Sequence, residues 1–106
     1  MKDKKFIEIK TYCKDLNIAN NIVIMLLNKR LIAGSRITKV LSKYYDSGLV
    51  KMDEKYEIKL ETIEEKFEFI ARQIDNFDKE NNYKITYTVI DGYNYDYKKY
   101  NEDAIR

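Results

Sequence analysis

Apolar and polar residues alternate over residues 5–12, and this period of two predicts a β-strand with one buried face. Residues 17–31 carry apolar side chains at helical spacing, which predicts an amphipathic helix. Asp15 or Asn17 is the expected N-cap, because short polar side chains accept hydrogen bonds from the first free amides of a helix. Gly34 follows and is the expected break into the next strand.

The middle of the chain predicts a long β-hairpin over residues 35–62. Residues 35–45 are rich in β-branched and aromatic side chains, which favour a strand. The next three residues, 46–48, read Asp-Ser-Gly, a turn signal in which the glycine can adopt a positive φ. Apolar and charged residues then alternate over residues 55–61, which predicts a strand that is buried on one face only.

The second half of the chain predicts a helix, a strand and a short terminal helix. Thr62 and Glu65 have the spacing of a capping box at the start of the first of these helices. Its expected buried face consists of Ile63, Phe67, Ile70, Ala71 and Ile74. Residues 83–90 alternate and predict the fourth strand, after which Asn94 is the expected cap of the terminal helix.

The resulting order, β-α-β-β-α-β plus a terminal helix, predicts an α+β protein. We expect a single ferredoxin-like domain over residues 1–106, with a four-stranded antiparallel sheet and both main helices on one face. The other face would then be uncovered. We expect Val40, Ile85 or Tyr87 on it, and apolar side chains there would indicate a partner subunit. The alternative is that this face is polar enough to be hydrated.

Composition narrows the classes of function. The 106 residues include 20 basic and 18 acidic side chains, a balance too even to predict a nucleic-acid or membrane partner. The chain has no His and a single Cys, which excludes imidazole-based catalysis and an intrachain disulfide. Residues 1–12 lack the apolar core of a signal peptide, so we expect a cytoplasmic protein.

Two other functions are compatible with the same order of elements. An RNA-recognition domain stacks bases on aromatic side chains of its central strands, whereas the outer side of residues 54–61 is charged. An acylphosphatase-like enzyme needs an anion-binding loop after the first strand, and residues 11–15 contain neither Gly nor Arg. We therefore expect neither RNA binding nor catalysis.

Four short segments, in order along nearly the whole chain, resemble those of a known family. They are residues 29–34 (KRLIAG), 42–50 (SKYYDSGLV), 60–62 (LET) and 94–100 (NYDYKKY). Their order and spacing are similar to those of the CutA family of divalent-cation tolerance proteins. The resemblance implies a ferredoxin-like fold with PII-like architecture, a homotrimer, a binding or regulatory role in the response to metal ions such as copper, and no catalysis.

Several positions depart from the pattern of that family. Gly34 stands where the family has Cys, Asp46 where it has Trp, and Glu61 where it has Lys. Lys55 replaces an acidic residue in the third strand, and only Tyr83 remains of a His-Pro-Tyr stretch before the last strand. An alternative function is therefore a structural or protein-interaction trimer that has lost metal binding.

Candidate metal ligands are few. Cys13 is the only thiol, and copper(I) favours thiolate and thioether ligands, so Cys13 with Met25 could bind it in a trimer. The simpler interpretation of a lone Cys is a small apolar core residue. Acidic residues that could hold a hard cation lack the spacing of a calcium loop and are expected to be solvated: Asp53, Glu54, Asp75, Asp78 and Glu80.

The tyrosines are the candidate ligand-binding residues. If the chain has the family geometry, the side chains expected to line a cleft between subunits are Tyr44, Tyr45, Tyr56, Tyr83, Tyr97 and Tyr100. Packing is the alternative, because a tyrosine can bury its ring while its hydroxyl reaches a partner or water. The identity of a ligand stays open.

Overall fold

A computed structural model of the chain describes residues 4–77, 79 and 83–106. The elements, in chain order, are β1 (Phe6–Cys13), α1 (Leu16–Asn28), β2 (Gly34–Asp46), β3 (Leu49–Ile63), the 3-10 helix η1 (Glu64–Lys66), α2 (Phe67–Phe77), β4 (Thr86–Ile90) and α3 (Tyr95–Ala104). This is the predicted order of strands and helices, so the α+β prediction is confirmed.

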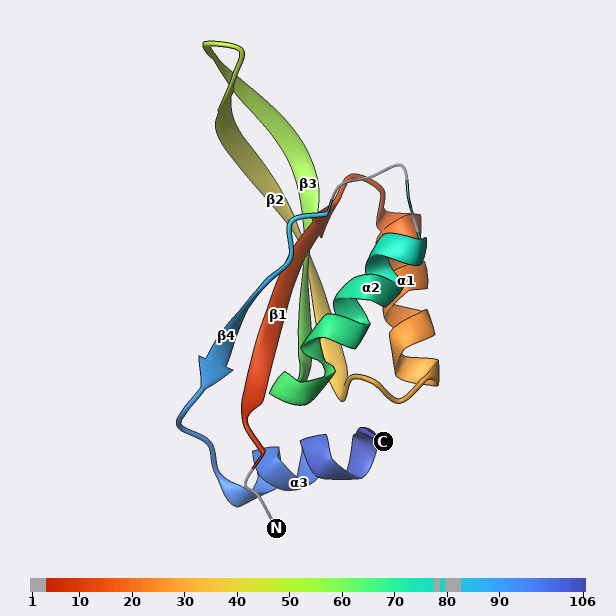
Figure 1. Cartoon of the computed structure of the whole chain (residues 1–106). Helices are drawn as coiled ribbons and strands as arrows, with labels where there is room; N and C mark the ends of the chain where they lie inside the picture. Colours follow the sequence, from red (N-terminus) through yellow and green to blue (C-terminus); the bar gives the residue numbers. More distant parts are fainter. Residues whose placement is uncertain (1–3, 78, 80–82) are drawn as a thin grey trace.

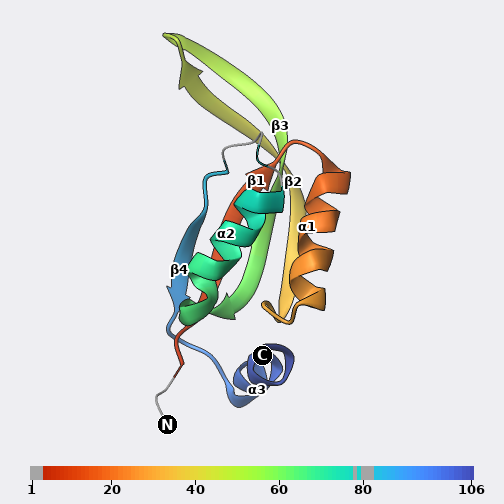
Figure 2. The same ribbon diagram turned by 45° about the vertical axis from the view of Figure 1, so that its right-hand side comes forward.

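The four strands form one antiparallel sheet in the order β2-β3-β1-β4. Helices α1 and α2 lie together on one face of the sheet, as predicted for a ferredoxin-like fold (Figures 1 and 2). The β2–β3 hairpin extends past the helices at one end of the molecule, and α3 lies at the opposite end (Figure 1). The shape is correspondingly long, with principal extents of 50 × 26 × 21 Å.

The core lies between the sheet and helices α1 and α2. Alternate residues of the inner strands and one stripe of each helix meet there, which is the outcome expected of periods of two and 3.6 residues. Its fully buried aliphatic side chains include Ile7, Ile9, Ile22, Leu26, Ile58, Leu60, Ile70 and Ile74.

The local signals at the helix starts and the hairpin turn are largely confirmed. The Asp15 carboxylate caps α1 and accepts from the Asn17 amide at 2.7 Å, and Asn94 caps α3. Ser47 and Gly48 have φ values of 53° and 79°, which is the pattern of a two-residue type I′ turn. The last strand is shorter than predicted, and the acidic candidates Asp78 and Glu80 lie outside the described residues.

The predicted capping box at Thr62 is wrong. Thr62 is still part of β3, where it lies opposite Ile7, and its hydroxyl donates to the Leu31 carbonyl at 2.7 Å. The chain then turns through η1, whose cap residue Ile63 makes no side-chain hydrogen bond. Because β3 extends through Thr62, Ile63 takes the cap position, and the Thr62 hydroxyl contacts the loop after α1.

The prediction that Ile85 and Tyr87 lie on an uncovered face is also wrong. Tyr87 lies opposite Ile9, which is a core residue, and cross-strand partners share one face of a sheet. The Tyr87 ring packs on Phe67 with 4.6 Å between ring centroids, and Ile85 packs against the same core. The apolar residues of this segment therefore face the helices.

The open face of the sheet is mainly charged, which agrees with the hydrated alternative. Glu8 lies opposite Glu61, and the next pair on this face is Lys10 with Lys59. Val40, opposite Lys55, is the one member of the predicted apolar set that shares this face. The open face therefore does not present the broad apolar surface that would by itself indicate a partner.

Candidate functional site

The hairpin tip is a two-stranded ribbon without support from the rest of the sheet. The pairing of β1 with β3 ends at Cys13 opposite Tyr56, whereas β2 and β3 remain paired as far as Asp46 opposite Leu49. An isolated two-stranded hairpin is at most marginally stable in water. The side chains on its two faces therefore determine whether the tip can stand alone.

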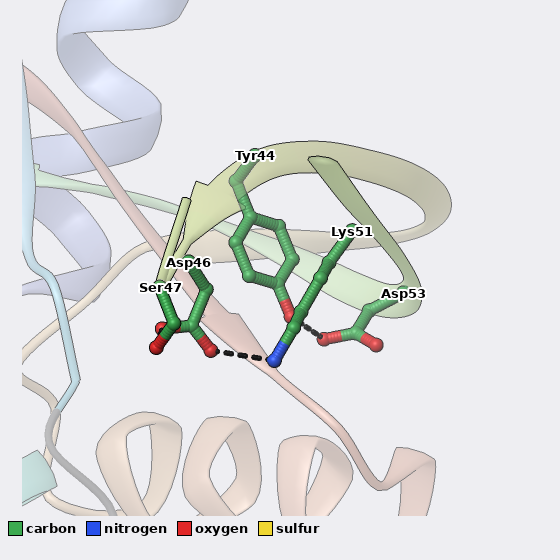
Figure 3. A network of polar contacts seen from close by, with 5 residues as sticks. All are labelled: Tyr44, Asp46, Ser47, Lys51 and Asp53. Atoms are coloured by element: carbon green, nitrogen blue, oxygen red, sulfur yellow. Dashed lines mark hydrogen bonds and ion pairs between the residues drawn. The ribbon is translucent and has the colours of Figure 1, made fainter. Parts of the chain in front are cut away.

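On one face of the tip, polar side chains pair with one another (Figure 3). The Tyr44 hydroxyl donates to the Asp53 carboxylate at 2.6 Å, and the Lys51 ammonium contacts the Asp46 carboxylate at 2.9 Å. The hydrogen bond to Asp53 raises the pKa of Tyr44, so this hydroxyl is protonated at neutral pH. The Lys55 ammonium lies 4.9 Å from the centre of the same ring.

The opposite face of the tip is apolar and exposed. Tyr45 lies opposite Val50, and Met52 lies opposite Lys43. Tyr45 is 80% exposed, and the other large apolar side chains of this face are at least 60% exposed. We call this surface the apolar tip face and define it as Leu41, Tyr45, Val50 and Met52.

The six tyrosines predicted to line a cleft do not meet within one chain. Tyr44 and Tyr45 are at the tip, while the helix that carries Tyr97 and Tyr100 is at the other end of the molecule (Figure 1). Half-buried Tyr56 lies opposite Cys13, and half-buried Tyr83 packs against the core. Only a neighbouring copy could bring the two groups together, so the cleft stays a prediction.

At the α3 end, aromatic rings cover the last part of the open face. The Phe6 ring is 1% exposed and meets Tyr93 and Tyr97 edge-on, with centroid distances of 4.9 and 5.8 Å. Burial raises the pKa of Tyr97 and of Tyr100, and the nearby Glu61 carboxylate raises both pKa values further. Both hydroxyls are therefore protonated at neutral pH.

Arg30 anchors the end of α3 to the loop after α1. Its guanidinium donates to the carbonyl of Ala104 at 2.9 Å and to that of Asp103 at 2.6 Å. Its own carbonyl accepts from the Arg106 amide at 2.9 Å. Arg30 has a φ of 57°, a left-handed conformation that costs energy in a residue with a Cβ. The sequence analysis missed this residue.

Arg30→Ala is expected to destabilise the protein by about 1–2 kcal/mol, because two carbonyls of α3 lose a charged donor. Arg30→Gly removes the same side chain but relieves the left-handed backbone strain, so we expect it to be about 1 kcal/mol more stable than Arg30→Ala. Chemical denaturation gives both values, and hydrogen exchange shows whether α3 is the element released. Equal stabilities of wild type and Arg30→Ala would contradict the anchoring role.

The described residues do not offer an evident donor set for a transition metal. Cys13 is 5% exposed and faces the core, and its thiol donates to the Asp15 carbonyl at 3.3 Å. Asp53 accepts from Tyr44, and Glu54 pairs with Lys39 at 3.2 Å. Within residues 4–77, 79 and 83–106, no group of three or more His, Cys, Asp and Glu side chains lies close enough to hold one metal ion.

Membrane insertion through a helix has no support in the described part of the chain. None of the helices there is both long enough and apolar enough to cross a bilayer.

The sheet order, the paired helices on one face and the projecting hairpin define a ferredoxin-like α+β protein. The model of the family described as CutA1 divalent ion tolerance protein matches residues 7–104. The chain therefore belongs to this family, and the resemblance seen in the four sequence segments is confirmed.

Solved structures agree with this assignment. CutA1 from Pyrococcus horikoshii is 24% identical with a TM-score of 0.87, over 94% of this chain and 98% of that one. CutA1 from Oryza sativa is 16% identical with a TM-score of 0.89, over 96% and 94% of the two chains. The periplasmic divalent cation tolerance protein CutA from Archaeoglobus fulgidus is 19% identical with a TM-score of 0.84, over 98% and 100%. These identities show the fold, and none of the curated proteins matches significantly.

Proposed function

We propose that the chain is a non-catalytic, homotrimeric binding or regulatory protein of the divalent ion tolerance family. The observation that supports assembly most directly is the apolar tip face. It projects beyond the chain's own helices, and its four side chains are at least 60% exposed. Exposed apolar patches on a small protein mark interaction sites, and a further copy of the chain would bury this one.

The edges of the sheet support the same proposal. Strands β2 and β4 are the two edge strands, and β2 is 13 residues long. An edge strand has unpaired backbone donors and acceptors along its outer side, which another strand can satisfy. Because the hairpin lengthens β2 beyond the body of the sheet, this edge can reach a second copy at the tip.

The open face also suits contact between copies. Its side chains alternate in sign, as in the pairs Glu8–Glu61 and Lys10–Lys59. A surface with both signs can be complementary to a symmetry-related copy of itself, and charge complementarity favours one arrangement over others. This face would contribute specificity, while the tip would contribute most of the apolar burial.

Native mass spectrometry of the tag-free protein tests the proposal. A homotrimer has three times the 12.8 kDa mass of one chain, and light scattering at micromolar concentration gives an independent value. A monomer by both methods would contradict assembly through the tip face. The masses also show whether a metal ion or a small molecule stays bound.

A second candidate function is an interaction trimer that does not bind a metal. The burial of Cys13 favours it, and so do the contacts that already occupy the tip carboxylates: Asp53 accepts from Tyr44, and Asp46 pairs with Lys51. A trimer whose mass is that of the three chains alone, after incubation with copper, would favour this candidate over metal binding. The cytoplasmic location stays a prediction of the sequence.

A further inference from the structure

The open face contains a pair of like charges at the end of the sheet that lies next to α3. Glu8 and Glu61 lie directly opposite each other on β1 and β3. Their side chains are only 24% and 13% exposed. Like charges directly across a strand pair are destabilising, and partial burial increases the effect, so this pair requires a cation nearby.

The chain supplies that cation itself. The Arg36 guanidinium, on β2, lies 3.5 Å from the Glu8 carboxylate and 3.8 Å from the Glu61 carboxylate. A guanidinium presents several donors and is always charged, so one side chain can bridge both acids and offset one of their two negative charges. A divalent ion at this pair would have to displace Arg36.

The space next to Glu61 is also filled from within the chain. Gly34 begins β2, and a Cβ at this position would collide with the Tyr100 hydroxyl of α3. The same Cβ would lie 3.5 Å from the Glu61 carboxylate, so the hydroxyl, the carboxylate and Gly34 form one packed cluster. Burial and then the Glu61 carboxylate raise the pKa of Tyr100, so this oxygen is a neutral hydroxyl at neutral pH.

We infer that the joint between α3 and β2 is filled by the chain's own groups. The Tyr100 hydroxyl lies over Gly34, and the Arg36 guanidinium bridges Glu8 and Glu61 in the place that a divalent ion would take. The family to which the chain belongs is described by divalent ion tolerance. The side chains present here do not fit such an ion. The inference concerns one chain and does not depend on the proposed trimer.

Arg36→Met tests the role of the guanidinium. The variant leaves Glu8 and Glu61 facing each other without a counter-ion, so we expect a lower Tm than that of wild type. Millimolar MnCl2 should restore at least half of that loss in the variant and leave the Tm of wild type unchanged. Lys39→Met removes a cation of the same strand that pairs with a single exposed acid, and it should show no response to manganese.

Gly34→Ala and Tyr100→Phe test the packing of the joint. The alanine variant should lower the Tm and increase proteolysis of α3, because its Cβ meets the hydroxyl. Tyr100→Phe removes only the hydroxyl, and the remaining ring carbon would lie 3.3 Å from the new Cβ. The double variant should therefore be more stable than Gly34→Ala alone.

Three results would overturn the inference. One is a stoichiometric copper(II) or manganese(II) site in the wild-type protein that is lost in Glu61→Gln, because that site would lie at the joint. Another is an Arg36→Met variant that is as stable as wild type or does not respond to manganese. The third is a double variant whose loss of Tm equals the sum of the losses caused by Gly34→Ala and Tyr100→Phe alone. A monomeric wild type would contradict the proposed trimer, but the three measurements would still test the inference about the joint.

Discussion

Replacing both Tyr45 and Met52 with alanine is expected to convert the proposed trimer into smaller species. Both side chains belong to the apolar tip face and are at least 60% exposed in the single chain. If a neighbouring copy buries them, each truncation removes about 1.5–3 kcal/mol of apolar burial, and the loss recurs in every copy. Light scattering across a dilution series measures the shift toward monomer.

The matched control for this experiment is Tyr95→Ala. Tyr95 is 70% exposed but lies on α3, at the other end of the molecule, so its loss should not change the assembly. Tyr44 is a less direct probe, because its hydroxyl bonds to Asp53 within the same hairpin. A Tyr45/Met52 double variant that stays trimeric at the wild-type dissociation concentration would show that the tip face is not the interface.

Thr62→Val is expected to destabilise the chain by about 1–3 kcal/mol, because the Leu31 carbonyl then loses a buried donor. The chain contains a matched control in Thr11, on the neighbouring strand. Both threonines are 0% exposed, but within the described residues the Thr11 hydroxyl has no hydrogen-bond partner. Thr11→Val should therefore be nearly neutral or stabilising.

Denaturant unfolding of the two valine variants measures this difference directly. The substitution, the change in shape and the burial are the same, so the difference measures what a satisfied hydroxyl contributes relative to an unsatisfied one. Equal losses of stability in both variants would mean that the contact between β3 and the loop after α1 contributes little.

Local sequence signals predicted most of the fold. The period of β1, the cap at Asp15 and the turn at Gly48 depend on neighbours within a few residues, and each is confirmed. The capping box failed because β3 runs one residue past the predicted cap, so Ile63 and not Thr62 precedes the first helical turn. The Thr62 hydroxyl instead contacts the Leu31 carbonyl, which is 31 positions away.

The assignment of apolar residues to the open face failed for a related reason. The alternation of β4 predicts that Ile85 and Tyr87 share one face, but the choice between the two faces depends on the pairing with β1. Tyr87 pairs with the core residue Ile9, so both side chains lie on the covered face. An apolar set in an alternating strand is better assigned to the covered face, since burial there removes more apolar surface from water.

The tertiary contacts that hold α3 had no local signal, although its Asn94 cap did. Arg30 contacts Ala104 across 74 positions, and its left-handed backbone is unusual for a residue other than glycine. The fit of Tyr100 over Gly34 likewise joins two distant segments. The sequence showed that the family's Cys is absent at position 34, but only the packing explains why a glycine stands there.

The unsupported length of the hairpin has a consequence for local unfolding. Between the turn and Tyr56, the hydrogen bonds of β2 and β3 have no third strand beside them in the described part of the chain. The inner strands are expected to open only with the whole core. A copy that covers the tip would supply the missing burial through mass action. The fraction of chains with an ordered tip would then depend on the protein concentration. Dilution would open the hydrogen bonds of the tip, while the amides in the body of the sheet would stay protected from exchange.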